Sequence, residues 1–548
     1  MKPFRVLLLG AVLARGLSAQ SATTTDITAA DLRQRLFALA HDSMGGRATG
    51  SLGNLKAAEY VAAELGRVGL EPAGESGTYF QTIPFFRLQP DVQLVLRVEG
   101  TPLALGRDII PVAQPSLFRP VDGLHVILGG RLADSGSWIP AEQAAGKVVL
   151  LDARAPNQGM FRFVGLTARS PRFARAALLV LPVLDALGGE SVTSLMAGRV
   201  STDTARSAAL TPVALATRAA AERLLGRPLD AATAGTLGRA VQGAIGTTPV
   251  PLPYPARNVV AVLRGSDPAL RNQYVSVTAH NDHVGFDHSP VDHDSLRAFN
   301  RVVRPMGADS RCRPPTAEEW RRIRAILDSL RRLRPPRPDS IRNGADDDGT
   351  GTVALVEIAE RLASDASPRP RRSILFVSHT AEEDGLLGSR WYTDHATVPV
   401  DSIVAEMDMD MIGRGGKADL PEGGPGYLEL IGWRRLSNEF GDLIAAVNAR
   451  QPSPFAFNLA YDAPGHPLQY YCRADHYSYA RYGIPSVSFS RGEHLDYHQV
   501  TDEAQYIDYD ALERVARFVA DLSLELANRE GRPRLDKPKG DPRAPCVQ

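Results

Sequence analysis

Six short apolar runs in the second half of the chain constrain its fold more than any other feature. They alternate with stretches of helical character and lie at residues 258–263, 274–280, 373–379, 403–410, 428–431 and 486–490. Strands that are apolar along their whole length are buried on both faces, as they are when helices cover both sides of a parallel sheet. The sequence therefore predicts an α/β fold, with a mostly parallel mixed sheet between layers of helices.

Histidine and acidic residues follow these runs where the strands are expected to end. They are His280, Asp282, Asp347, Glu382, Glu383, Asp408, Asp410, His494 and His498. In sheets of this kind, functional groups gather at the carboxyl ends of the strands. Carboxylate and imidazole ligands suit zinc, with cobalt or manganese as substitutes, and two ions could share one carboxylate. Considered alone, Glu382 and Glu383 would be interpreted as part of a solvated loop that caps the next helix. Histidine or acidic residues at five strand ends favour a metal centre instead.

Composition excludes some classes of protein. Lysine plus arginine and aspartate plus glutamate both number 62, and this balance argues against a dedicated nucleic-acid binder.

Residues 1–20 resemble a signal peptide, which predicts a secreted or periplasmic protein, and no later stretch is long and apolar enough to span a membrane. The three cysteines, Cys312, Cys472 and Cys546, allow at most one bridge, and we predict none.

Changes in composition divide the chain. Residues 21–104 and 251–530 are expected to form one main domain. Residues 105–250, rich in Ala, Val, Leu and Gly and with one histidine, are expected to form an inserted domain without chemistry of its own, the alternative being more of the same core. Residues 531–548, rich in Pro, Lys, Asp and Arg, are predicted to be a flexible tail.

A long insertion at residues 284–342 interrupts the alternation of strands and helices. It contains a capping-box pattern at 316–319, followed by a helical apolar stripe and by seven arginines between 321 and 337. The favoured interpretation is a solvated amphipathic helix packed on the body. The alternative is a rim element that shapes substrate access.

The motifs resemble those of the di-zinc exopeptidases that include aminopeptidase Y and the bacterial leucyl aminopeptidases. Glutamate carboxypeptidase II and the transferrin receptor are more distant relatives. The matching motifs are Gly46–Ser51, Ala279–His283, Asn343–Gly351, Ala381–Ser389, Asp410–Arg414, Asp475–His476 and Tyr497–Gln499. The resemblance covers about residues 30–100 and 250–527 and implies a zinc-exopeptidase, phosphorylase/hydrolase-like fold, while residues 105–250 resemble a protease-associated domain.

The resemblance also implies a role for each matching position. His280 and Asp410 would bind one zinc ion, Glu383 and His498 would bind a second, and Asp347 would bridge the two. Glu382 would be the general base, Asp282 would orient His280, and Tyr471 would stabilise the oxyanion. Loop-orienting roles are expected for Asp346, Asp348 and Asp408, and positions around the site for His283, His476 and His494.

The function that the resemblance implies is that of a secreted zinc aminopeptidase acting on peptides. A carboxypeptidase of the same family is an alternative and would need arginines to grip a carboxylate, for which Arg414 and Arg473 are candidates. A glutaminyl-cyclase-like transferase and a non-catalytic, receptor-like binding protein are further alternatives. The single cysteine near Tyr471 and the long insertion depart from the usual pattern and bear on substrate preference. The preferred side chain, the peptide length and the oligomeric state are left open by the sequence.

Overall fold

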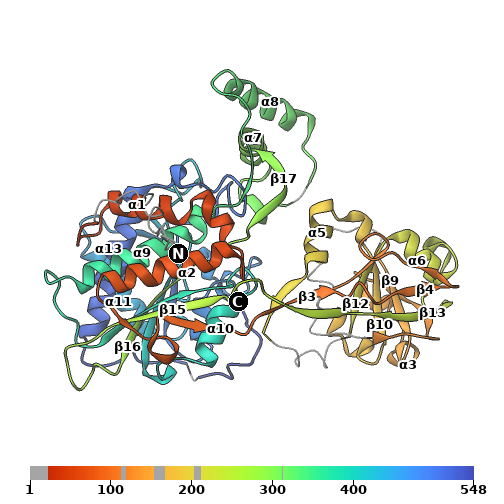
Figure 1. Ribbon diagram of the computed structural model, residues 1–548, viewed down its shortest axis with the longest axis horizontal. Coiled ribbons are helices and arrows are strands. Elements are labelled where there is room, and N and C mark those ends of the chain that lie inside the picture. Colours follow the sequence, from red (N-terminus) through yellow and green to blue (C-terminus); the bar gives the residue numbers. More distant parts are fainter. Residues whose placement is uncertain (1–22, 113–118, 154–166, 203–210, 312, 538) are drawn as a thin grey trace, which may run out of the picture.

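The computed structural model describes residues 23–112, 119–153, 167–202, 211–311, 313–537 and 539–548. The predicted signal peptide lies outside these residues. Two bodies, each built around a sheet, lie side by side, and a smaller helical projection extends from the main body (Figure 1). Among the described residues, none of the helices combines the length and the apolar character that a membrane span needs.

The main sheet has the strand order β1-β15-β19-β16-β20-β23-β21-β22. Its four central strands run parallel: β19 (Ser373–His379), β16 (Tyr274–His280), β20 (Ile403–Met409) and β23 (Ser486–Ser490). The antiparallel strands β15 (Arg257–Leu263) and β21 (Tyr427–Ile431) flank them. The edges are completed by β1 (Glu71–Pro72), β2 (Phe80–Thr82) and β22 (Ala456–Asn458). The predicted mixed, mostly parallel sheet is therefore confirmed.

Helices cover both faces of this sheet, which explains why its strands are apolar throughout. One face packs against α1 (Ala29–Leu39), α2 (Leu52–Arg67), α9 (Gly351–Ala363), α11 (Asn438–Ala449) and α13 (Tyr509–Asn528). The other face packs against α10 (Leu387–Asp394) and α12 (His476–Ala480). Because side chains alternate along a strand, Val259 and Ala261 enter the first core, whereas Val260 and Val262 enter the second.

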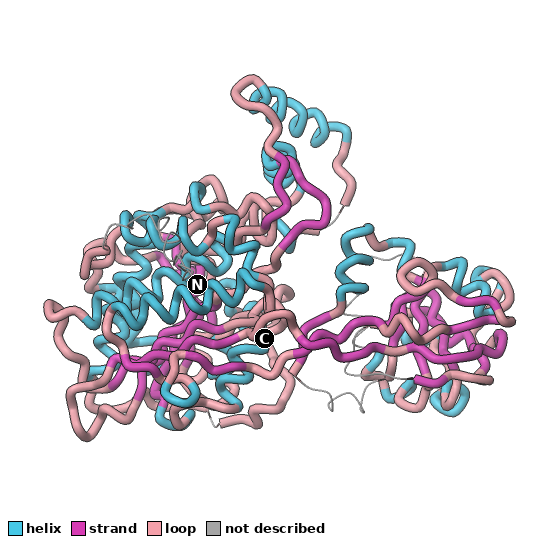
Figure 2. Tube along the Cα trace, in the orientation of Figure 1, coloured by secondary structure: helices cyan, strands magenta, loops and turns pink. Residues whose placement is uncertain are grey.

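A second sheet lies between residues 96 and 245 and has hydrophobic cores of its own (Figure 2). Its parallel strands are β8 (His125–Arg131), β9 (Val148–Asp152), β10 (Leu178–Pro182) and β12 (Val213–Ala216). The remaining strands are β4 (Leu96–Val98), β5 (Thr101–Pro102), β6 (Ile109–Pro111), β7 (Arg119–Pro120) and β13 (Leu237–Ile245). Helices α3 (Ala141–Ala144), α5 (Gly189–Ala197) and α6 (Arg218–Leu225) belong to the same segment.

The chain passes between the two bodies through paired strands. β3 (Phe86–Pro90) runs antiparallel to β14 (Thr247–Pro251), and β11 (Arg199–Ser201) pairs with the other edge of β3. The second sheet begins with β4 and β5, before the predicted boundary at residue 105. These short strands pair only with each other and with distant β13, a contact that local sequence does not report. The protease-associated character of this body stays a prediction.

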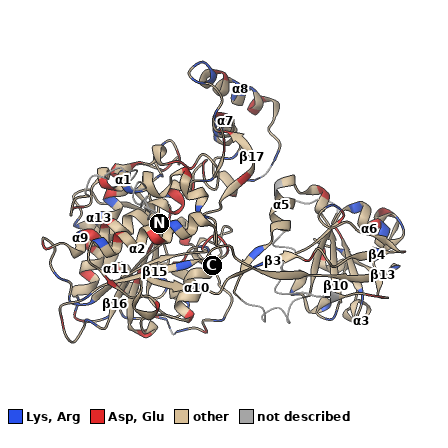
Figure 3. Cartoon of the chain, in the orientation of Figure 1, with Lys and Arg blue, Asp and Glu red and all other residues tan. Residues whose placement is uncertain are grey.

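The insertion at residues 284–342 forms the helical projection. β17 (Phe286–Asp292) and β18 (Pro338–Ile341) pair at its base, and α7 (His293–Val303) and α8 (Ala317–Arg331) form its tip. Thr316 and Glu319 form the predicted capping box. However, α8 packs on α7 through Ile323 rather than on the main body, so the favoured interpretation was wrong on this point. Figure 3 shows basic and acidic residues interspersed on α8.

The last residues of the chain are held against the main body, contrary to the predicted flexible tail. A disulfide joins Cys472 to Cys546 across 74 residues, a pairing that we did not predict. The side chain of Gln548 accepts a hydrogen bond from the Tyr471 amide at 2.9 Å and donates to the carbonyls of Tyr461 and Ala463. Polar composition indicated disorder, but a covalent link and specific hydrogen bonds stabilise this segment.

Candidate metal centre

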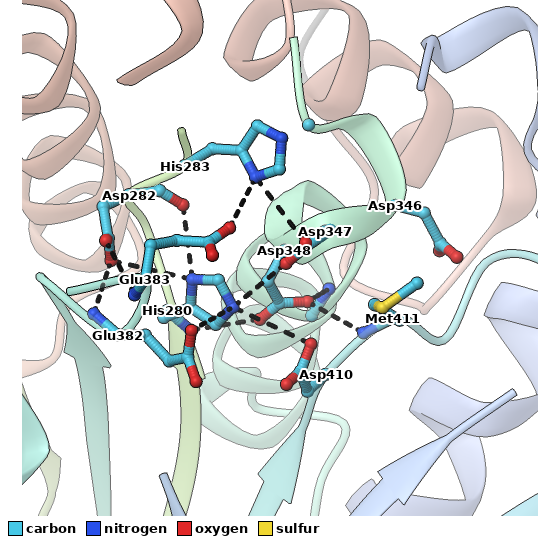
Figure 4. Close-up of polar contacts among 12 residues, drawn as sticks. His280, Asp282, His283, Asp346, Asp347, Asp348, Glu382, Glu383, Asp410 and Met411 are labelled. Atoms are coloured by element: carbon cyan, nitrogen blue, oxygen red, sulfur yellow. Dashed lines mark hydrogen bonds and ion pairs between the residues drawn. The ribbon is translucent and has the colours of Figure 1, made fainter. Parts of the chain in front are cut away.

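The candidate ligands meet at one edge of the main sheet, where the four parallel strands end. His280 is the last residue of β16, and Asp410 follows β20 directly. Glu382 and Glu383 lie three and four residues after β19, and His498 lies on the loop after β23. Asp347 lies in the short segment η9 (Ala345–Thr350) that leads into α9. The order of the parallel strands thus brings together residues more than two hundred positions apart. Figure 4 shows His280, Asp347 and Asp410 with the two glutamates at this edge.

Two groups of side chains converge around Asp347. On one side, Nε2 of His280 lies 3.3 Å from Oδ1 of Asp347 and 3.7 Å from Oδ1 of Asp410. On the other side, Nε2 of His498 lies 3.0 Å from Oδ2 of Asp347 and 3.0 Å from Oε2 of Glu383. Each oxygen of Asp347 faces a different group, which is the geometry expected of a bridging carboxylate. The peptide bond between Asp347 and Asp348 is cis.

The buried polar atoms of this centre fit a divalent metal. Six of them have no hydrogen-bond partner among the described residues: Nε2 of His280, Nδ1 and Nε2 of His283, Oδ2 of Asp347, Oε1 of Glu383 and Oδ1 of Asp410. Buried groups of this kind are costly unless they are hydrogen-bonded, paired or bound to a metal. Imidazole nitrogen and carboxylate oxygen are ligands that zinc accepts.

The two adjacent glutamates lie in different surroundings. Glu383 contacts His498 and lies 2.8 Å from Nδ1 of His283, whereas Glu382 comes no closer than 4.0 Å to Nε2 of His280. Burial raises the pKa of Glu382 well above its usual range. Burial also opposes ionisation of Glu383, but the histidines beside it hold its pKa at about 2. The geometry therefore suits Glu383 for ligation and Glu382 for proton transfer.

Asp282 holds both glutamates in place. Its carboxylate accepts hydrogen bonds from the backbone amides of Glu382 at 3.2 Å and Glu383 at 3.3 Å. Nδ1 of His280 lies 3.2 Å from the Asp282 carbonyl oxygen and 3.6 Å from the carboxylate. The predicted contact with His280 is thus present, and the contacts of Asp282 with the amides of Glu382 and Glu383 were not predicted.

The glycine-rich motif near the start of the chain supports the ligand loops. Arg47 is fully buried and donates hydrogen bonds to the carbonyls of Asn281, Asn343 and Gly344. The first carbonyl lies beside His280, and the other two lie on the loop that carries Asp347. One side chain therefore connects two of the loops that form the centre.

The other acidic residues bind backbone or side-chain donors. Asp348 accepts from the amides of His280 at 3.0 Å and Gly351 at 2.9 Å. Asp346 contacts Nε2 of His494 at 3.1 Å, and Asp408 accepts from the Thr278 hydroxyl at 3.0 Å. The loop-orienting roles predicted for Asp346 and Asp348 agree with these contacts, whereas Asp408 on β20 contacts the neighbouring strand β16. Asp348 also lies near His280 and Asp410, but hydrogen bonds engage both of its oxygens.

Tyr471 is not brought to the centre. Its ring packs against Arg435, with the guanidinium carbon 4.1 Å from the ring centroid, and against Tyr477. Tyr470 and Tyr497 instead line a cavity together with Asp347, Glu382 and His498. Adjacent residues on a turn point in different directions, so the cavity is lined by Tyr470 and not by Tyr471, for which the oxyanion role was predicted.

The projection reaches the centre through its short helical turn at Gly307–Asp309. The amide of Ala308 donates to the carbonyl of Tyr497 at 3.1 Å, and Asp309 contacts Arg473 at 2.5 Å. Arg473 lines the same cavity as the ligands. The predicted alternative, a rim element, therefore agrees with the contacts of the insertion.

Comparisons with known proteins bear on the fold and the family. Residues 258–523 match the model of peptidase family M28. Leucine aminopeptidase 1 from Paracoccidioides brasiliensis (strain Pb18) is 31% identical over 194 residues, which cover 34% of this chain and 47% of that protein. Aminopeptidase YwaD from Bacillus subtilis (strain 168) is 24% identical over 204 residues, 35% of this chain and 40% of that protein. The chain thus spans less than half the length of these relatives.

Two solved structures have the same overall fold. The aminopeptidase from Aneurinibacillus sp. strain AM-1 superposes with a TM-score of 0.50 at 16% identity, covering 93% of this chain and 96% of that one. A zinc aminopeptidase from Bacillus subtilis has a TM-score of 0.50 at 16% identity, covering 93% and 97%. The segment that matches the family model carries every candidate metal ligand from His280 to His498, and this part of the chain is therefore similar to peptidase family M28.

Proposed function

We propose that this chain is a secreted, zinc-dependent aminopeptidase that removes the N-terminal residue of peptides. The observation that carries the proposal is the pair of ligand groups that share Asp347, with Glu382 beside them. His280 and Asp410 would hold one zinc ion, and Glu383 and His498 would hold the second. The named aminopeptidases among the relatives support the same class of reaction. The disulfide between Cys472 and Cys546 is typical of an oxidising compartment.

Different residues of the chain would take part in different steps of hydrolysis. When bound, zinc would polarise the scissile carbonyl and lower the pKa of water at the site. Glu382 would accept a proton from the attacking water and pass it to the amine that leaves as the C–N bond breaks. Asp282 would fix the positions of Glu382 and Glu383 by accepting hydrogen bonds from their backbone amides.

A carboxypeptidase is the second candidate, and the arginines bear on it. Arg414 is buried and engaged by Asp419 and by Asp496, so it is not available to a substrate carboxylate. Arg473 does line the cavity, but its guanidinium is paired with Asp309 at 2.5 Å. These contacts favour the aminopeptidase over the carboxypeptidase.

Hydrolysis of defined substrates tests the proposal. The metal-loaded protein should cleave aminoacyl-p-nitroanilides, lose this activity with a chelator, and regain it when zinc is added back. Metal analysis should find two zinc ions per chain. N-acetylated versions of the same substrates should resist cleavage, because an aminopeptidase needs a free amine. Cleavage of N-blocked peptides from the carboxyl end, or equal activity in chelator, would contradict the proposal.

A further inference from the structure

A narrow cavity of about 70 Å³ extends from the metal centre along the main sheet. Asp347, Glu382, Asp410 and His498 line the end at the candidate ligands. The remaining wall includes Glu429, Tyr470, Arg473, Ser488, Ser490 and Glu493. Two of these residues, Glu429 and Glu493, are acidic side chains that the mechanism above does not use.

Strand pairing explains how Glu429 comes to line the cavity. Glu429 on β21 is the register partner of Ser490 on β23, and Ile431 is the partner of Ser488. Residues two apart on a strand point to the same side, so these four side chains share one face of the sheet. β23 also leads directly into the loop that carries His498. The strand that pairs with Glu429 and the candidate ligand His498 are therefore neighbours along the chain.

Gly492 keeps the space beside Glu429 open. A Cβ atom at this position would lie 2.8 Å from Oε1 of Glu429 and 2.7 Å from Cδ1 of Leu420. Its φ of 88° is also a conformation that side chains rarely adopt. The local backbone therefore requires glycine next to the carboxylate.

Among the described residues, no cationic side chain lies within hydrogen-bonding distance of either carboxyl group, although Glu493 interacts with Tyr470 and Asp309. Oε1 of Glu429 accepts a hydrogen bond from the Tyr427 hydroxyl at 2.5 Å, and Glu429 forms no ion pair with the described residues. Glu493 is 7% exposed, and its Oε2 accepts no hydrogen bond from any described residue. Burial raises the pKa of Glu429 to about 7 and that of Glu493 to about 8. A buried carboxylate in this situation gains from a cationic partner.

Arg473 does not neutralise this wall. It lies 2.5 Å from Asp309 but 3.8 Å from Oε1 of Glu493. The guanidinium therefore has two acidic neighbours, Asp309 and Glu493, and its closest contact is with Asp309. The wall thus presents two carboxyl groups without a close cationic partner, and an anionic side chain would be poorly matched to it.

We propose that this cavity binds the positively charged side chain of the substrate's N-terminal residue, with Glu429 and Glu493 as the groups that select lysine-type side chains. The inference rests on the proposed aminopeptidase function. The volume of about 70 Å³ is well below the about 150 Å³ of a cavity that binds benzene, so the cavity favours an unbranched side chain over an aromatic one.

A matched pair of substrates isolates the charge. Lysine p-nitroanilide and norleucine p-nitroanilide differ mainly in the terminal ammonium, so the ratio of their kcat/KM values reports recognition of the cation. We expect zinc-loaded wild-type protein to favour lysine at least about tenfold, as a charge-assisted hydrogen bond would. Glu429→Gln and Glu493→Gln should each lower this ratio several-fold. Glu142→Gln, on exposed α3 of the second body, is the matched control and should retain the ratio.

The outcomes separate the inference from the proposed function. A wild-type protein that cleaves norleucine as well as lysine overturns the inference and leaves the aminopeptidase proposal intact. A lysine preference that survives both glutamine variants overturns the assignment to Glu429 and Glu493. Failure of the zinc-loaded protein to cleave any aminoacyl substrate contradicts the proposed function itself.

A second measurement does not depend on the folding of variants. Lysine amide and norleucine amide can be compared as competitive inhibitors of leucine p-nitroanilide cleavage by the wild-type protein. Lysine amide should bind at least about tenfold more tightly, and equal inhibition by the two amides would overturn the inference.

Discussion

At the scale of single residues, one peptide bond separates Glu382 and Glu383, for which we propose two different tasks. Glu383 contacts His498 and His283 closely, whereas Glu382 has no ion-pair contact shorter than 4.0 Å with the described residues. A side chain that is already engaged by ligand histidines can hold a metal but cannot easily move away with a proton. The less engaged neighbour is free to accept one. The division of roles follows from contacts that differ within one dipeptide.

Replacing Glu382 with glutamine tests this division. The variant keeps the size of the side chain and leaves all five proposed ligands in place, so it should retain bound zinc. Because an amide cannot accept the proton, kcat should fall by about 10²- to 10⁴-fold. Turnover of an aminoacyl-p-nitroanilide and the zinc content of the same sample would be measured together.

Glu383→Gln is the informative contrast to this variant. It should lower zinc content as well as turnover, because it changes a ligand. If Glu382→Gln lost zinc while Glu383→Gln retained both zinc and activity, the two roles would have to be exchanged.

At the scale of elements, the C-terminal segment forms part of the approach to the centre. A larger cavity of about 690 Å³ is lined by Glu382, Glu383 and His498 and also by the segment from Pro542 to Cys546. The Cys472–Cys546 disulfide fixes this segment beside the loop that carries Tyr470 and Arg473. A stretch whose composition predicts disorder thus becomes a wall of a functional cavity.

Removal of the disulfide should destabilise the protein. A bridge that closes a long loop restricts the unfolded chain, so Cys546→Ser should lower the free energy of unfolding by about 2–4 kcal/mol. Urea denaturation of the zinc-loaded protein would measure the change.

Thiol titration checks the pairing directly. The sequence has three cysteines, so the denatured, unreduced protein should contain one free thiol if Cys472 and Cys546 are bridged. Three free thiols would rule out the bridge. Unchanged stability of Cys546→Ser would show that the bridge contributes little to the fold.

At the scale of the whole molecule, a buried ionic network joins three helices of the main body. Arg35 on α1 contacts Glu64 on α2 and both Glu357 and Glu360 on α9. Burial raises the pKa of Glu357 to about 7, whereas Arg67 and the other polar neighbours of Glu360 outweigh its burial and lower its pKa. The two glutamates therefore contribute differently to the pH dependence of stability.

The sign of this effect follows from the direction of the shift. In the unfolded chain Glu357 loses its proton near its ordinary pKa of about 4.3, but in the folded protein it keeps the proton up to about pH 7. The folded state binds more protons in this interval, so the contribution of Glu357 to the free energy of unfolding falls as pH rises from about 4.3 to about 7. Glu357→Gln should remove this contribution.

Urea denaturation at about pH 5 and about pH 8 would compare the wild type with this variant. The free energy of unfolding should fall less with pH in Glu357→Gln than in the wild type. Glu360→Gln serves as the control, because a group with a lowered pKa is ionised in both states across this range. Equal pH dependence of wild type and Glu357→Gln would contradict the prediction.

The sequence by itself determined the main sheet and the set of candidate ligands. Apolar runs, helical periodicity and short motifs are local patterns, and the carboxyl ends of parallel strands meet at one edge whatever the details of packing. The strand ends marked a wider set of histidine and acidic residues, and the resemblance to di-zinc exopeptidases then implied ligand roles for His280, Asp347, Glu383, Asp410 and His498 and a separate role for Glu382.

Only the tertiary structure decided the features that depend on side-chain direction and on contacts between distant segments. Spacing could not choose between Tyr470 and Tyr471, because neighbouring side chains on a turn diverge. It could not pair Cys472 with Cys546, and it could not bring Glu429 and Glu493 to one cavity from different strands. These features arise when separate elements pack together, and no local pattern in the chain records which side chains will then meet.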